Sequence, residues 1–208
     1  ALANTAANQE TVNEADDLTI GTWSNTGDSS ITVGGTLTIP DAGLAGIGSD
    51  ISISSNDIND VSGRELSFTA NELSLDLVSP AGDISLVTDV DTLQLIAGGS
   101  ASVSVLETDV LNLSDLRAFG SAVDINSGNF TVSAGSLTIS DDVLSQQGNI
   151  TLAASGDVVI NADLRANDAL ANGVREGLID IVIDDFFVFP VIDQSTSAEN
   201  PVLLIVRV

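Results

Sequence analysis

The chain has 208 residues, of which 30 are acidic and 5 are basic, and it contains no histidine and no cysteine. The formal charge of −25 argues against binding to nucleic acid or to an anionic membrane surface, because both depend on a surplus of Lys and Arg. The longest apolar runs, 186–192 and 202–206, are far shorter than the roughly 18 residues of a membrane-spanning helix, and a disulfide framework is excluded.

Residues 1–17 form a polar N-terminal segment. We predict either a linker that reaches a neighbouring molecule or a tail. The first three residues, Ala-Leu-Ala, are consistent with the position just after a cleaved signal peptide, or with a fragment boundary. The first alternative is favoured, so we expect an exported protein that is extracellular or lies at the cell surface.

Residues 18–165 are dominated by triplets in which two apolar residues flank one small residue, such as 137–139, 150–152 and 158–160. Alternation with a period of two is the signal of a β-strand. One series of apolar positions recurs at a nearly constant spacing: Leu73, Leu93, Leu111, Phe130 and Ile150. A second series shows the same spacing: Ile84, Val103 and Val123. A period of about 20 residues indicates a solenoid.

The fold predicted for 18–165 is an all-β parallel β-helix, or β-solenoid, of about 7–8 coils and roughly 35–40 Å in length. A triplet buries two side chains, and it gains stability only when the next coil stacks on it and extends the core. We expect a left-handed backbone at the glycine-containing corners 34–35, 98–99, 128–129 and 148–149. The alternative fold, a β-sandwich, would show strands of about five or six residues without such a period.

The segments GNFTVSAGSLTIS (128–140) and LSQQGNITLAASGDVVINADL (144–164) resemble the repeats of filamentous-haemagglutinin-like exoproteins and adhesins. The resemblance covers approximately residues 18–165. Members of that family are secreted, right-handed parallel β-helices with repeats of about this length. The resemblance therefore implies a secreted β-helix and is compatible with an adhesive or structural function.

Residues 166–208 interrupt the repeat and are predicted to be a C-terminal β segment that acts as a cap or as a donor strand. The last residues are apolar on both faces of a strand, so they need cover on both sides. We predict that they self-associate with a neighbouring subunit by strand addition, through Val202, Leu203, Leu204, Ile205, Val206 and Val208. Pairing with 178–192 of the same chain is the alternative.

A calcium site is the metal-binding possibility that the sequence offers. Thr88-Asp89-Val90 recurs one period later as Thr108-Asp109-Val110, which would place Asp89 above Asp109, with Asp91 nearby. A hard cation bridging these carboxylates would relieve their repulsion. The alternative is a solvated acidic face, and no other cofactor is expected.

Paired acids at 16–17, 141–142 and 184–185 are the candidates for acid–base catalysis, but adjacent strand residues point to opposite faces. We therefore expect no enzyme. The predicted function is a secreted structural or adhesive protein that assembles with copies of itself into a fibre, biofilm matrix or surface layer, with possible contacts to surface glycans. The alternatives are a carbohydrate- or ice-binding module, suggested by the many Ser and Thr residues at triplet centres, and a polysaccharide-active enzyme.

Overall fold

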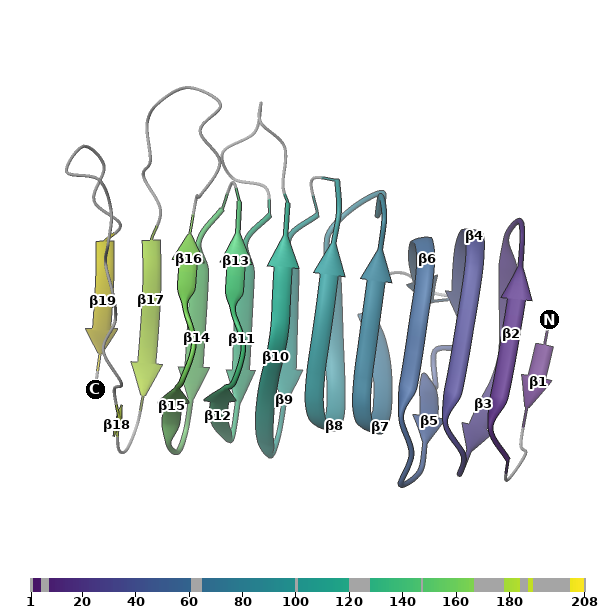
Figure 1. Cartoon of the computed structure of the whole chain (residues 1–208), viewed down its shortest axis with the longest axis horizontal. Coiled ribbons are helices and arrows are strands. Elements are labelled where there is room, and N and C mark those ends of the chain that lie inside the picture. The colour runs from purple at the N-terminus through teal and green to yellow at the C-terminus, as the bar shows by residue number, and fades with distance from the viewer. Residues whose placement is uncertain are drawn as a thin grey trace.

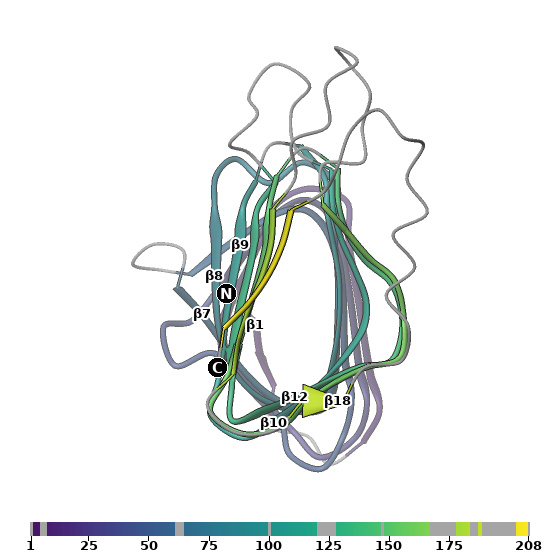
Figure 2. The ribbon, with the colours of Figure 1, turned by 90° about the vertical axis from the view of Figure 1, so that its left-hand side faces the viewer.

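The computed structural model describes residues 2–4, 8–60, 65–99, 101–119, 128–146, 148–166, 178–183, 187–188 and 203–207. These residues are all-β without a helix, and they form a parallel β-solenoid of about seven turns, which confirms the predicted fold class. Successive strands lie side by side from the N-terminal end to the C-terminal end (Figure 1). Viewed along the solenoid axis, the coils superimpose as an oval outline (Figure 2).

One side of each coil, here called face A, begins with β1 and ends with β19. Each strand pairs in parallel with the strand one coil later. Its strands are β1 (Leu2–Asn4), β3 (Leu18–Asn25), β5 (Leu44–Gly46), the first part of β7 (Glu65–Leu77), the first part of β8 (Ile84–Ala97), β9 (Val103–Glu107), β11 (Phe130–Ala134), β14 (Ile150–Ala154), β17 (Leu178–Ile183) and β19 (Leu203–Arg207).

The opposite side, face B, begins with β2 and ends, within the described ranges, with β16. It contains β2 (Glu10–Glu14), β4 (Ser29–Ile39), β6 (Ile51–Asp60), the second parts of β7 and β8, β10 (Val110–Ala118), β13 (Val143–Ser145) and β16 (Leu164–Ala166). Short strands extend this side in the last coils: β12 (Ser136–Ile139), β15 (Val158–Ile160) and β18 (Phe187–Val188).

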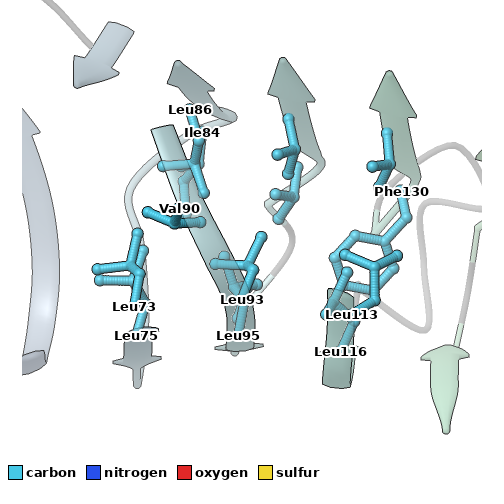
Figure 3. Close-up of a cluster of buried hydrophobic side chains, with 14 of the residues drawn as sticks. Leu73, Leu75, Ile84, Leu86, Val90, Leu93, Leu95, Leu113, Leu116 and Phe130 are labelled. Atoms are coloured by element: carbon cyan, nitrogen blue, oxygen red, sulfur yellow. The ribbon is translucent and has the colours of Figure 1, made fainter. Parts of the chain in front are cut away.

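The core is a set of columns of apolar side chains, one member from each coil. Leu73 and Leu93 belong to one column, and Leu86 belongs to a column on the facing side (Figure 3). In the strands whose side chains are described, alternate residues point inward for most of the strand length, so the stacked coils bury one continuous apolar interior. Burial of apolar surface, at about 25 cal/mol per Å², is the main force that holds coil to coil.

The predicted register is right for some pairs and wrong for others. Leu73 pairs with Leu93, and Phe130 with Ile150, as the repeat spacing predicts. Leu111, however, pairs with Leu137, and the residue stacked on Leu93 is Leu113. Ile84 pairs with Val103 as predicted, but Val103 then pairs with Phe130, and the expected partner Val123 lies outside the described residues.

A bulge in β10 changes the register again further along the strand. The register of β10 against β8 shifts between Leu113 and Leu116, and Asp115 has a φ of 62°. Asp tolerates this left-handed conformation better than most residues. Its carboxylate accepts a hydrogen bond from Arg117 Nε, and this bond raises the pKa of Arg117. At its other edge β10 pairs with two strands, with β12 before the bulge and with β13 after it.

The glycine corners are explained by two different constraints. Gly99 and Gly128 have positive φ, as predicted. Gly34 and Gly98 do not, and here the constraint is the close approach of two coils. A Cβ on Gly98 would lie 2.0 Å from the carbonyl oxygen of Val78, and one on Gly34 would lie 2.2 Å from that of Ala15. Gly34 and Gly98 are therefore needed for space. The prediction of a left-handed backbone is right at corners 98–99 and 128–129 and wrong at corners 34–35 and 148–149, where no residue has positive φ.

Candidate functional site

Polar side chains connect successive coils at the corner where face A begins. Each of them immediately precedes the first inward residue of its strand, and each accepts a hydrogen bond from the backbone N–H one coil later. Ser102 N–H donates to Asp83 Oδ1 (3.0 Å), and Asn129 N–H donates to Ser102 Oγ (3.3 Å). Asn149 N–H donates to Asn129 Oδ1 (2.8 Å), and Leu178 N–H donates to Asn149 Oδ1 (2.9 Å). We call this set, Asp83, Ser102, Asn129 and Asn149, the corner ladder.

The backbone reinforces the same corner. The N–H of Ile84 donates to the Ser102 carbonyl (2.8 Å), and the N–H of Phe130 donates to that of Asn149 (2.9 Å). Comparable side-chain bonds run from Asp50 N–H to Asp28 Oδ1 (3.3 Å) and from Asp163 N–H to Asp142 Oδ1 (3.2 Å) on face B. Asp and Asn thus satisfy corner N–H groups that the strand pairing leaves without a partner.

Two shallow depressions lie beside these corners. One, of about 310 Å³, is lined by Asp83, Ser102 and Asn129 of the corner ladder together with Ile84, Ser85, Val103, Ser104 and Thr131. The other, of about 210 Å³, lies at the start of face B and is lined mainly by acidic and hydroxyl residues: Asp28, Ser29, Ser30, Asp50, Ser52, Glu72 and Ser74, together with Gln9 and Ile51.

Hydroxyl side chains form a rank on each face next to these corners. Ser85, Ser104, Thr131 and Thr151 occupy one register position on face A, and Ser30, Ser52 and Ser74 do so on face B. Hydroxyls and carboxylates in such ranks can accept and donate hydrogen bonds to a polyhydroxylated ligand or to ordered water. An aromatic platform for sugar stacking is not part of either depression, since the one tryptophan, Trp23, is buried in the core.

The three residues of the predicted calcium site are all exposed. In the register, Thr88 pairs with Glu107 and Asp89 pairs with Thr69. No group of three or more Asp, Glu, His or Cys side chains able to hold a metal ion occurs in the described portion of the chain. The structure therefore does not bring Asp89, Asp91 and Asp109 together as a metal-binding cluster.

The paired acids that are described have structural partners. Asp17 Oδ1 accepts a hydrogen bond from Thr36 N–H (2.8 Å) of the next coil. Asp142 Oδ1 likewise accepts one from Asp163 N–H, which also belongs to the next coil. Arg165 forms salt bridges with two of these carboxylates: its Nη2 atom lies 2.6 Å from Asp163 Oδ2 and 3.9 Å from Asp142 Oδ2. The pair 184–185 lies outside the described residues. These contacts give the Asp residues a function as corner acceptors, which the sequence does not distinguish from ordinary turn chemistry.

Glu107 is a buried carboxylate that no sequence pattern singles out. It occupies an inward position at the end of β9 and is 3% exposed. Its Oε2 accepts the N–H of Val90 (2.9 Å), and its Oε1 accepts those of Thr108 (2.7 Å) and Asp109 (3.3 Å). Three backbone donors compensate for the lost hydration of the charge.

Face A continues beyond β14 with two more strands, β17 and β19, whereas the inward column of face B that contains Val12 ends at β16. On face B, one inward column runs from Val12 through buried residues to Leu164. Val12 and Leu164 are only partly buried, although both pack against the core. Among the described strands, β2 pairs only with β4, and β16 pairs only with β13.

The predicted self-association strand lies at the C-terminal end of face A (Figure 1). Leu203, Leu204, Ile205 and Val206 belong to β19, which pairs in parallel with β17 of the same chain. Val202 and Val208 lie outside the described residues. One edge of β19 is thus used within the chain, and the second edge has no partner among the strands that the structure describes.

No family model matches the chain, and no curated protein or solved structure matches it either. The resemblance to filamentous-haemagglutinin-like proteins therefore extends to the parallel β-solenoid architecture alone. In the described ranges there is no helix with the length and hydropathy needed to cross a membrane.

Proposed function

We propose that the protein is a secreted structural or adhesive β-solenoid that assembles end to end with copies of itself. The observation that carries this proposal is the pair of incomplete ends. Among the described strands, β1 at one end of face A pairs only with β3 and β19 at the other end pairs only with β17, so another molecule can continue this parallel sheet at either end. Because the two ends differ, the contact is heterologous and gives an open filament.

The surface composition is compatible with an extracellular matrix or surface layer. The charge of −25 keeps the sides of the solenoid soluble and discourages lateral association at low salt. Contacts are then directed to the ends, where parallel strand edges supply backbone hydrogen bonds.

The test is electron microscopy and sedimentation of the purified full chain, compared with a variant in which residues 199–208 are replaced by a Gly/Ser segment of equal length. We expect filaments from the full chain and none from the variant, with β-rich circular dichroism retained in both. A full chain that stays monomeric at all concentrations, or a variant that polymerises like the full chain, would contradict the proposal.

A second candidate function is recognition of carbohydrate or ice by the hydroxyl ranks. The specific observation is that Ser85, Ser104 and Thr131 stack in register and line one depression. Replacing Ser104 and Thr131 by Val should then abolish binding on a glycan array or thermal hysteresis of the isolated monomer. If the unmodified monomer shows neither activity, this candidate is excluded.

A further inference from the structure

The first and last strands of face A lie at opposite ends of the solenoid (Figure 1). β1 pairs in parallel with β3, and β19 pairs in parallel with β17. Neither strand has a second partner among the strands that the structure describes. Both belong to the same parallel sheet, so the outer edges of β19 and β1 are the two kinds of edge that neighbouring strands of face A bring together in every coil.

The two edge strands carry core positions in the same alternation. Leu2 and Asn4 of β1 share register positions with buried residues of β3. Leu204 and Val206 of β19 share register positions with buried residues of β17. A pairing of β19 with β1 that is shifted by one residue would exchange core and surface positions. The registers that keep the core continuous therefore differ from one another by two residues.

One column of register positions on face A distinguishes among them. Its members from the fourth coil onward are Ser67, Val87, Leu106, Ser133, Ala153, Val182 and Arg207. At the N-terminal end Ala3 pairs with Thr22. Thr22 belongs to the same column, because Ser24, Ala45 and Thr69 pair in turn and each lies two positions after a member of the column. Ala3 is therefore the first position of the column among the described strands, and Arg207 is the last.

We infer that β19 of one molecule pairs in parallel with β1 of a second copy of this chain, with Arg207 at the register position next to Ala3. This inference rests on the proposed end-to-end assembly and specifies its contact. Val206 is then paired with Leu2 of the second copy. That pair continues an inward column whose members in β14 and β17, Leu152 and Ile181, are fully buried. The first coil of the second copy begins beyond β19, so it does not overlap with β17 or β19.

A second copy fits this edge better than an unrelated peptide does. β1 is already held in the strand conformation by β3, so its addition to β19 costs less ordering entropy than the addition of a free peptide. The contact uses β19 of one molecule and β1 of the other. Each added copy therefore presents its own β19 for the next, and the assembly grows in one direction as an open filament.

The experiment mixes single-cysteine variants of the full chain, which has no cysteine of its own. Ala3→Cys is mixed with Arg207→Cys and, as the matched control, with Ile205→Cys, which lies two positions earlier on the same strand. In the inferred register the Cα atoms of positions 3 and 207 are about 4.8 Å apart, within reach of a disulfide, and those of positions 3 and 205 are about 8 Å apart, beyond it. Under mild oxidation we expect a disulfide-linked heterodimer from the first mixture and none from the control mixture.

Each variant oxidised alone measures linkage by random collision, and circular dichroism verifies that all three variants fold. Electron microscopy of the reduced proteins shows whether they assemble. Filaments that give no heterodimer at positions 3 and 207, or as much of it at positions 3 and 205, would overturn the inferred register and leave the proposed assembly intact. An unmodified protein without filaments, together with a 3/207 mixture without heterodimer, would overturn both.

Discussion

Glu107 is a carboxylate that the core of face A encloses in an inward-facing column. Thr88 pairs with it from the preceding coil, and Phe68 lies one coil before that. The charge is held there because three backbone N–H groups point at it, one of them from the preceding coil. An unpaired polar group in such a place would cost about 1–3 kcal/mol.

Glu107→Ala should therefore lower the free energy of unfolding by about 2–3 kcal/mol, because it leaves the N–H of Val90, Thr108 and Asp109 without an acceptor. Glu107→Gln keeps one carbonyl oxygen and should lose less. Urea denaturation followed by circular dichroism measures both. The control is Glu65→Ala, an exposed position where a change within about 0.5 kcal/mol is expected. Equal stability of the Glu107→Ala and Glu65→Ala variants would show that the carboxylate is not a corner acceptor.

At the scale of the strand and its corner, the corner ladder determines how one coil is aligned with the next. Asn129 and Asn149 each use a side-chain oxygen to hold the backbone N–H of the following coil. Parallel strand pairing aligns the strands of each face, and the corner ladder determines where β9, β11, β14 and β17 begin.

Asn149→Ala should destabilise the protein by about 1 kcal/mol and increase the hydrogen exchange rate of the Leu178 amide, which loses its acceptor. Asn161→Ala is the matched control, because Asn161 is exposed and contributes its backbone N–H to the Ile139 carbonyl, a bond that the substitution keeps. Exchange at Leu178 that is unchanged by Asn149→Ala would contradict this assignment.

How far the sequence predicts these elements depends on how constant the coil length is. Leu73 and Leu93 are separated by a coil of the usual length, so the sequence period predicts their pairing. The coil between Val103 and Phe130 is longer, and extra residues in a coil carry only a small entropic cost. A fixed period cannot detect this longer coil. The wrong partner of Leu93 has a different cause, because Leu111 and the true partner Leu113 are both inward positions of β10.

The candidate site was less predictable than the fold. The apolar character of β19 could be recognised from composition, but its pairing with β17 could not. Glu107 is visible in the sequence as a single acidic residue, yet its burial and its three backbone hydrogen bonds become recognisable only in the structure.

At the scale of the whole molecule, the charge of −25 is distributed along a narrow solenoid. Carboxylates of successive coils are stacked about 4.8 Å apart wherever they share a register position, so self-repulsion opposes the folded state. Raising the ionic strength from about 0.01 to 0.15 M shortens the Debye length from about 30 to 8 Å and screens this repulsion.

The unfolding temperature of the monomer should therefore rise over this range of NaCl concentration, by several degrees, as measured by circular dichroism at a fixed low protein concentration. Substituting arginine for the exposed Asp89 and Asp91 should reduce the salt dependence, because it lowers the repulsion on one face. An unfolding temperature that falls with added salt would show that attractive ion pairs dominate, contrary to this prediction.

The central claim is that residues of successive coils lie beside one another in parallel. It is tested most directly by engineered disulfides in a chain that has no cysteine of its own. Thr131 pairs with Thr151, and Ser133 with Ala153, on face A. Parallel neighbours are about 4.8 Å apart, within reach of a disulfide, whereas the crossed pairs Thr131 with Ala153 and Ser133 with Thr151 are about 8 Å apart. Under mild oxidation of the monomer, double cysteine variants at 131/151 and 133/153 should form disulfides, and those at 131/153 and 133/151 should not. Efficient bonding of the crossed pairs with failure of the parallel pairs would mean antiparallel strands and would contradict the solenoid.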